Sequence, residues 1–182
     1  PTTGGNSSLA CIGCPMGTYS TVVGAVSSSF CANCYAGKYS SMIGANSAAY
    51  CYDCPRGTYL SPDSPLFPGI SVSACENCPL GYYSTTLGAL SFSSCELCPA
   101  GTYALLPALG SEEDCSRCPE GTYSSATGQT TMSVCLECPY GTSPAGSTTE
   151  DDCQILCPAG TTGTPTETNP DGPGCTLCPA GT

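Results

Sequence analysis

The sequence predicts a small disulfide-rich protein of all-β and irregular structure, built as an elongated solenoid-like array of short hairpin modules that are each closed by a disulfide bond. Two observations support this fold class. The 182 residues include 18 Cys, 22 Gly and 17 Pro but no Trp, no His and only 3 Phe. Such a chain cannot assemble a conventional apolar core, so covalent cross-links must supply much of its stability. The cysteines also recur as close pairs at regular intervals, which is typical of a tandem repeat.

Nine cysteine pairs define the repeat, and their first members follow one another at intervals of 18 to 24 residues. Second cysteines open the phrase Cys-Pro-x-Gly-Thr-Tyr, as at residues 14–19, or a close variant of it, as at Cys34 and Cys78. A second Gly follows the first after seven residues, as at Gly24. The pairs are Cys11/Cys14, Cys31/Cys34, Cys51/Cys54, Cys75/Cys78, Cys95/Cys98, Cys115/Cys118, Cys135/Cys138, Cys153/Cys157 and Cys175/Cys178.

Each part of the phrase predicts a piece of local structure. Pro after Cys fixes φ and starts a turn, and the first Gly of the phrase, as at Gly17, needs positive φ or a close approach of another backbone. Thr-Tyr-Ser is a short β-forming run. We expect the second Gly to turn the chain back and the Ser/Thr stretch after it to return as the second strand. The Tyr is expected to lie over the disulfide or against the next module, because one aromatic per repeat is a natural spacer.

The repeat divides the chain into four segments. Residues 1–10 complete a preceding module, 11–152 hold seven repeats of about 20 residues, 153–174 form a divergent Thr/Pro-rich repeat, and 175–182 begin a further one. Ser143 and Thr162 stand where earlier repeats have Tyr. The chain begins at Pro1 and stops at the opening of another repeat, so we interpret it as a mature or excised piece of something longer.

Three pairings of the cysteines are open, because sequence alone does not prove connectivity. Joining first to first and second to second cysteines uses pairs two at a time, which nine pairs do not allow, and a bond within Cys-x-x-Cys closes too small a loop to organise a module. We favour joining each second cysteine to the first of the next pair, which closes one loop per module and is worth about 3 kcal/mol each in the chain-entropy model. The predicted bonds are Cys14–Cys31, Cys34–Cys51, Cys54–Cys75, Cys78–Cys95, Cys98–Cys115, Cys118–Cys135, Cys138–Cys153 and Cys157–Cys175.

That pairing leaves Cys11 and Cys178 without partners. A second copy placed after Thr182 would bring its Cys11 to a spacing of 15 from Cys178, the same as from Cys138 to Cys153. One hypothesis is therefore an intermolecular Cys178–Cys11 bond in a head-to-tail polymer, since a heterologous contact that does not close builds a filament. The alternative is truncation within a longer array.

The tandem phrase, best developed from Cys11 to Cys138, resembles the ephrin-receptor-like cysteine-rich repeats, which are relatives of the tumour-necrosis-factor-receptor and furin-like modules. The resemblance implies a rod of disulfide-linked modules in the extracellular part of a surface protein. Similar repeats occur in large protist and algal surface proteins, including those that resemble flagellar-hair (mastigoneme) components. The motif is specific for fold and weak for function.

Catalytic and metal chemistry have little support. Without His there is no Ser-His or Cys-His dyad, and nine consecutive pairs with an unbroken Pro-x-Gly phrase favour disulfides over zinc. The acidic runs 112–114 and 150–152 lack the alternating ligand spacing of a calcium loop. We therefore expect no enzyme activity, no cofactor and no metal.

Charge and sequons point to an extracellular glycoprotein. The net charge of −11 repels phosphate backbones and anionic lipid, which disfavours nucleic-acid and membrane partners, and no apolar run approaches the roughly 20 residues that span a bilayer. Asn6 begins an N-glycosylation sequon, and 161–168 resembles an O-glycosylated stretch.

The sequence favours a secreted structural protein, a segment of a fibre, stalk or surface coat whose partners are copies of itself or other matrix proteins. The alternative is a ligand-binding or adhesive ectodomain. A binding module should break its repeat with exposed apolar residues, and 60–70, in the 24-residue interval, is the only such insertion.

Overall fold

A computed structural model describes residues 12–139, 141–154, 161–163 and 175–177 of the chain. These residues form short strands and single 3-10 turns and hold no α-helix. The strands are β1 Thr18–Tyr19, β2 Ala32–Asn33, β3 Lys38–Tyr39, β4 Tyr52–Asp53, β5 Thr58–Tyr59, β6 Glu76–Asn77, β7 Tyr82–Tyr83, β8 Glu96–Leu97, β9 Thr102–Tyr103, β10 Ser116–Arg117, β11 Thr122–Tyr123, β12 Leu136–Glu137, β13 Thr161–Gly163 and β14 Cys175–Leu177. The 3-10 turns are η1 Ser28–Phe30, η2 Ala48–Tyr50, η3 Val72–Ala74, η4 Phe92–Ser94, η5 Glu112–Asp114, η6 Met132–Val134 and η7 Glu150–Asp152.

Consecutive strands pair as separate antiparallel hairpins, and no sheet among the described residues has more than two strands. In the first hairpin Thr18 lies opposite Asn33 and Tyr19 opposite Ala32. The small disulfide-rich, all-β and irregular fold class is therefore confirmed.

The position of the second strand differs from the expectation. The Ser/Thr stretch does not return as a strand but forms the 3-10 turn, and the second strand is the pair of residues inside the next Cys-x-x-Cys. In the first hairpin the hydroxyl of Ser27 accepts the N–H of Ser29, and Cys31 N–H closes the turn on Ser28 O at 3.0 Å. Because Ser competes for backbone groups locally, it favours such caps over a strand.

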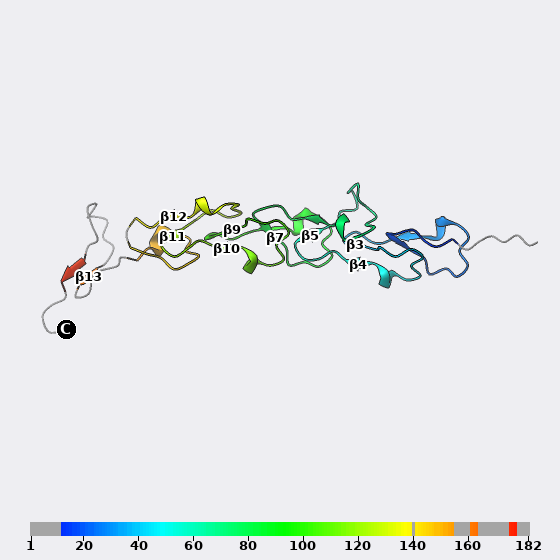
Figure 1. The fold of residues 1–182 in the computed structure, drawn as a ribbon, viewed down its shortest axis with the longest axis horizontal. Coiled ribbons are helices and arrows are strands. Elements are labelled where there is room, and N and C mark those ends of the chain that lie inside the picture. Colours follow the sequence, from blue (N-terminus) through cyan, green and yellow to red (C-terminus); the bar gives the residue numbers. More distant parts are fainter. Residues whose placement is uncertain (1–11, 140, 155–160, 164–174, 178–182) are drawn as a thin grey trace, which may run out of the picture. The chain divides into compact units, whose positions relative to one another are not determined.

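We number as modules 1 to 7 the segments 14–31, 34–51, 54–75, 78–95, 98–115, 118–135 and 138–153. The chain divides into two compact units, the first made of Pro1–Cys78 with Ser84–Cys95 and the second of Pro79–Tyr83 with Glu96–Thr182. The first unit holds the hairpins β1–β2, β3–β4 and β5–β6, and the second holds the four hairpins from β7 to β14. Figure 1 labels most of these arrows along the chain, with the 3-10 turns as short coils between them.

Only small apolar clusters are buried, and each contains cysteines. In the first unit Leu60 is fully buried with Cys54, Ala74 and Cys75, and in the second Tyr83 packs with Cys98, Ala104 and Cys115. A core this thin leaves many large apolar side chains in water, so its stability depends on cross-links and backbone hydrogen bonds.

Candidate functional site

Seven disulfide bonds join the modules' ends, each linking the second cysteine of one pair to the first cysteine of the next. Their Cα–Cα distances lie between 5.6 and 6.0 Å, inside the range that an unstrained bridge needs. The bonds are Cys14–Cys31, Cys34–Cys51, Cys54–Cys75, Cys78–Cys95, Cys98–Cys115, Cys118–Cys135 and Cys138–Cys153.

The remaining predicted positions lie at the ends of the chain. Asn6, Cys11, Cys157 and Cys178 fall outside the described residues, and Cys175 is described only as the first residue of β14. The Cys157–Cys175 bond, the intermolecular Cys178–Cys11 bond and glycosylation of Asn6 therefore stay predictions.

Neighbouring modules are joined by a repeated set of three backbone hydrogen bonds. The N–H of the phrase glycine donates to a carbonyl of the next module, and so does the N–H of the residue that follows the strand. In return, the second glycine of the next module donates its N–H to the carbonyl of the cysteine that opens the first module. Between modules 1 and 2 the N···O distances are 2.8, 3.0 and 2.7 Å. The complete sets are Gly17–Ser40, Ser20–Ala45 and Gly44–Cys14; Gly57–Ser84, Leu60–Ala89 and Gly88–Cys54; Gly101–Ser124, Ala104–Gln129 and Gly128–Cys98; and Gly121–Ser143, Ser124–Ser147 and Gly146–Cys118, with the donor first in each pair.

The residue that follows the strand Tyr is the buried centre of this junction. Ser40 and Ser84 are fully buried, and Ser124 is 3% exposed. Sequence reasoning treated this Ser as part of a short β-forming run and missed its role. The available signal was its recurrence directly after Tyr in module after module, which a surface residue does not require.

Phrase glycines also approach the module two places further on. Gly37 in module 2 has φ of 75°, and a methyl group placed on it would overlap the carbonyl oxygen of Gly88 in module 4. Gly101 in module 5 has the same relation to Gly146 in module 7. Positive φ and close backbone approach, the two reasons expected for this glycine, therefore operate together.

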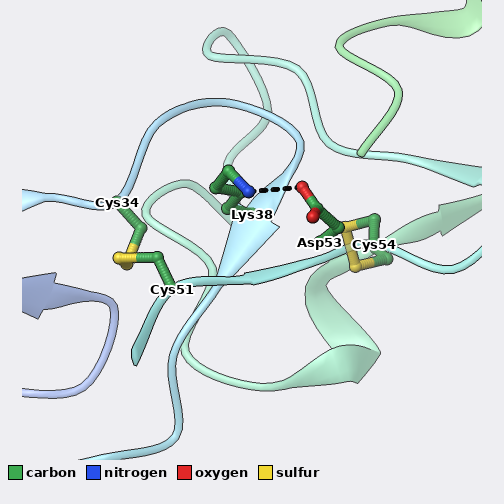
Figure 2. A network of polar contacts seen from close by, with 6 residues as sticks. Cys34, Lys38, Cys51, Asp53 and Cys54 are labelled. Atoms are coloured by element: carbon green, nitrogen blue, oxygen red, sulfur yellow. Dashed lines mark hydrogen bonds and ion pairs between the residues drawn. A yellow bond between two sulfur atoms is a disulfide. The ribbon is translucent and has the colours of Figure 1, made fainter. Parts of the chain in front are cut away.

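An ion pair lies beside one of these approaches. Lys38 Nζ of β3 donates to Asp53 Oδ1 of β4, directly across the hairpin, as the dashed line in Figure 2 shows. A methyl group on Gly88 would come within 2.6 Å of that same carboxylate oxygen, so module 4 packs closely against the pair. The side chains are 35% and 48% exposed, and such pairs contribute at most about 1 kcal/mol.

Two strand tyrosines pack against a cluster that contains the cysteines of the following module, as one of the two sequence expectations proposed. Tyr39 contacts the cluster that contains Cys54 and Cys75, and Tyr83 packs with Cys98 and Cys115. In these two modules the aromatic ring adds apolar surface to a cluster that is otherwise small.

Two of these tyrosines face a glutamate on the paired strand. Tyr83 donates its hydroxyl to Glu96 Oε2 at 3.0 Å, and Tyr59 donates to Glu76 Oε2 at 3.4 Å. Burial raises the pKa of both phenols, and the negative carboxylates raise the pKa further because they favour the neutral hydroxyl. These groups are structural hydrogen-bond donors at neutral pH.

The acidic runs next to cysteines cap 3-10 turns. Asp114 Oδ2 accepts the N–H groups of Gly110 and Ser111 at 3.0 and 2.8 Å. Asp152 Oδ2 likewise accepts those of Thr148 and Thr149, and these backbone hydrogen bonds lower the pKa of its carboxyl group. One carboxylate of each acidic run is therefore engaged with the backbone.

The insertion in module 3 brings apolar side chains to the surface and also buries one. Leu66 and Ile70 are 48% and 53% exposed beside a shallow pocket of about 300 Å³, whereas Leu60 is fully buried and packs against Phe67. A leucine thus stands at the junction position where other modules have Ser or Ala.

The described residues hold no group of three or more Cys, Asp or Glu that could ligate a metal ion. Within that part of the chain, none of the helical segments has the length and hydropathy needed to cross a bilayer.

Residues 2–51 match the family described as tyrosine-protein kinase ephrin type A/B receptor-like. No curated protein sequence matches the chain significantly. The disulfide-closed unit found in the matched region recurs through module 7. This type of module and the seven disulfides fit an extracellular or cell-surface location.

Proposed function

We propose that this chain, whose residues 2–51 match the ephrin-receptor-like family, is extracellular structural material, a segment of a fibre, stalk or surface coat that bears tension and resists proteolysis. The observation that carries the proposal is the junction, which repeats the same three backbone hydrogen bonds between neighbouring modules at four places along the chain. The stability of such an array is approximately the sum of the stability of each module and of the contacts between neighbouring modules. Modules can therefore be added without a new core.

The disulfide path supports a mechanical role. A force applied along the chain passes from one disulfide to the next through a Cys-x-x-Cys segment. The 15 to 21 residue steps enclosed by each disulfide do not carry this force and cannot extend. The second cysteines, such as Cys34 and Cys98, are fully buried. Reductants therefore have limited access to these sulfur atoms, and proteases have few extensible segments to cleave.

In this proposal successive copies join head to tail, with Cys178 of one copy bonded to Cys11 of the next. The native material is examined by electron microscopy and on a non-reducing gel, beside a Cys178→Ser variant. We expect filaments and a ladder of covalent oligomers that collapse to a single band on reduction or in the variant. Wild-type protein that runs as a monomer without reductant would contradict the covalent joint.

A second candidate function is favoured by the insertion in module 3. Its exposed Leu66 and Ile70 flank a pocket whose other walls are mostly apolar, which is the form that a protein-binding ectodomain would use. A Leu66→Ser/Ile70→Ser double variant separates the functions. It should leave filaments intact if the chain is structural, and abolish capture of an extracellular partner if the insertion is a binding site.

A further inference from the structure

Each module begins its 3-10 turn with a hydroxyl residue, and four turns carry a second hydroxyl two residues later. The two oxygens then lie within hydrogen-bond distance of one another, 2.6 to 2.9 Å apart. The pairs are Ser27/Ser29, Ser71/Ser73, Ser91/Ser93 and Thr131/Ser133.

The first hydroxyls of the pairs in modules 3, 4 and 6 do not cap the backbone of their turns. The first hydroxyl of η1 and that of η2 accept an N–H of their own turn, and the acids cap η5 and η7. By contrast, the side chains of Ser71, Ser91 and Thr131 make no cap hydrogen bond. A substituent on these turns would cost the described fold no backbone contact.

Two sets of hydroxyls that recur through the repeat are unavailable. The strand threonines are largely buried and donate to the carbonyl of the phrase proline, as Thr58 does to Pro55 O at 2.7 Å. The junction serines are buried as well. The Ser/Thr density of the sequence therefore overstates the number of sites that an enzyme could modify.

The same three turns place a large, partly exposed apolar side chain between the two hydroxyls. Val72 and Met132 are 52% and 55% exposed. Phe92 is 44% exposed, and its ring also packs edge-on against Tyr59 with the centroids 6.2 Å apart. Where the second hydroxyl is absent, the middle residue is small or charged instead, namely Ala48, Glu112 or Glu150. Hydroxyl pairs and exposed apolar groups therefore occur together at these turns, in three modules of the described chain.

We propose that Ser73, Ser93 and Ser133 are O-glycosylation sites, whose sugars lay a C–H face over Val72, Phe92 and Met132. All three serines are exposed. Covering apolar surface is favourable by about 25 cal/mol per Å², and a sugar ring offers apolar C–H groups on one face and hydroxyls on the other. This inference deepens the proposed function, and it rests only on the extracellular placement.

The transfer needs a sugar-nucleotide donor and a transferase of the secretory pathway. The serine Oγ bonds to the anomeric carbon as the bond from that carbon to the phosphate oxygen breaks. The nucleoside diphosphate leaves with the electron pair, and the hydroxyl proton passes to a base of the transferase. The resulting glycosidic oxygen still accepts a hydrogen bond from the first hydroxyl of the pair, and the turn is retained because neither hydroxyl caps it.

Glycopeptide mass spectrometry of the native protein tests the sites directly. After reduction and alkylation, cleavage at Lys, Arg and Glu yields 57–76, 77–96 and 121–137, which each contain one predicted serine, and the control peptide 39–56, which contains Ser47. We expect site-localised sugar on the three serines and an unmodified Ser47. Unmodified peptides at the three turns, or equal modification of Ser47, would overturn the proposal.

A second measurement tests the covering role. In protein with labelled methionine methyl groups, the Met132 methyl should show nuclear Overhauser effects to sugar protons, whereas Met16 and Met42 should show none. The effects at Met132 should disappear in Ser133→Ala and persist in Ser29→Ala. Sugar present without any contact to Met132 would refute the covering role. Neither result bears on whether copies join into filaments, so failure of the two proposals is distinguishable.

Discussion

Reduction of single disulfides under constant force should lengthen the chain in steps whose size is set by the loops. Five of the seven bonds enclose 17 residue steps between Cα atoms about 5.6 to 6.0 Å apart. At roughly 3.5 Å per residue of extended chain, releasing one such loop adds about 54 Å. The loop of module 3 has 21 steps and should add about 68 Å, and that of module 7 has 15 and should add about 47 Å.

Single-molecule force clamping in the presence of a thiol reductant measures these steps one bond at a time. Without reductant, no step near 50 Å should occur, because only the three-residue Cys-x-x-Cys links remain extensible. The reasoning is refuted if unreduced protein already shows such steps. Uniform steps of roughly 64 Å would instead indicate pairing across 20 residues, and steps of a few Å would indicate bonds inside Cys-x-x-Cys.

Three further predictions concern stability, each measured as a shift of the urea midpoint. Gly37→Ala should lower the free energy of unfolding by about 3 kcal/mol or more, because positive φ and overlap with a neighbouring backbone add together. Gly24→Ala, at the same φ but with no atom within 4 Å, should lower it by only about 1 kcal/mol. Equal losses in the two variants would contradict the close approach at Gly37. Leu60→Ala should cost about 2 to 5 kcal/mol for a fully buried leucine, and a loss below about 1 kcal/mol would mean that the module 3 cluster is not packed. The raised pKa of Tyr83 contributes stability that is fully present below its ordinary value of 10.0 and is lost as the pH rises through the raised value. Tyr83→Phe should therefore lose less stability than wild type as the pH rises above about 10; exposed Tyr35→Phe is the control, and should follow wild type.

The sequence was informative where the repeat constrains covalent and backbone geometry. Cysteine spacing and the Pro-x-Gly phrase are local signals, and they predicted the fold class and the reason for the phrase glycine. The second strand was misplaced because the Ser/Thr stretch forms a 3-10 turn, which Ser27 and Ser47 cap, and β-propensity does not capture this competition. The junction was missed because its partners are backbone atoms some 25 residues apart, such as Ser20 N and Ala45 O, and main-chain contacts leave little trace in residue type.

The insertion shows how far local compensation extends. Module 3 has four extra residues in its loop, yet Leu60 still donates its N–H to Ala89 O as Ser20 does to Ala45 O. Its side chain fills the added space against Phe67. The sequence did not predict the burial of the Leu60 side chain, because Leu60 follows Tyr just as the junction serines do. Only the packing of the longer loop explains why a leucine replaces serine there.

Because neighbouring modules contact one another largely through backbone groups, one module of this pattern can follow another with little change. Duplication or deletion of a stretch of DNA that encodes one module would leave each remaining junction with the same kind of backbone partners. Arrays of different lengths can therefore arise within a lineage by unequal recombination, and selection on reach needs no accompanying selection for new complementary surfaces.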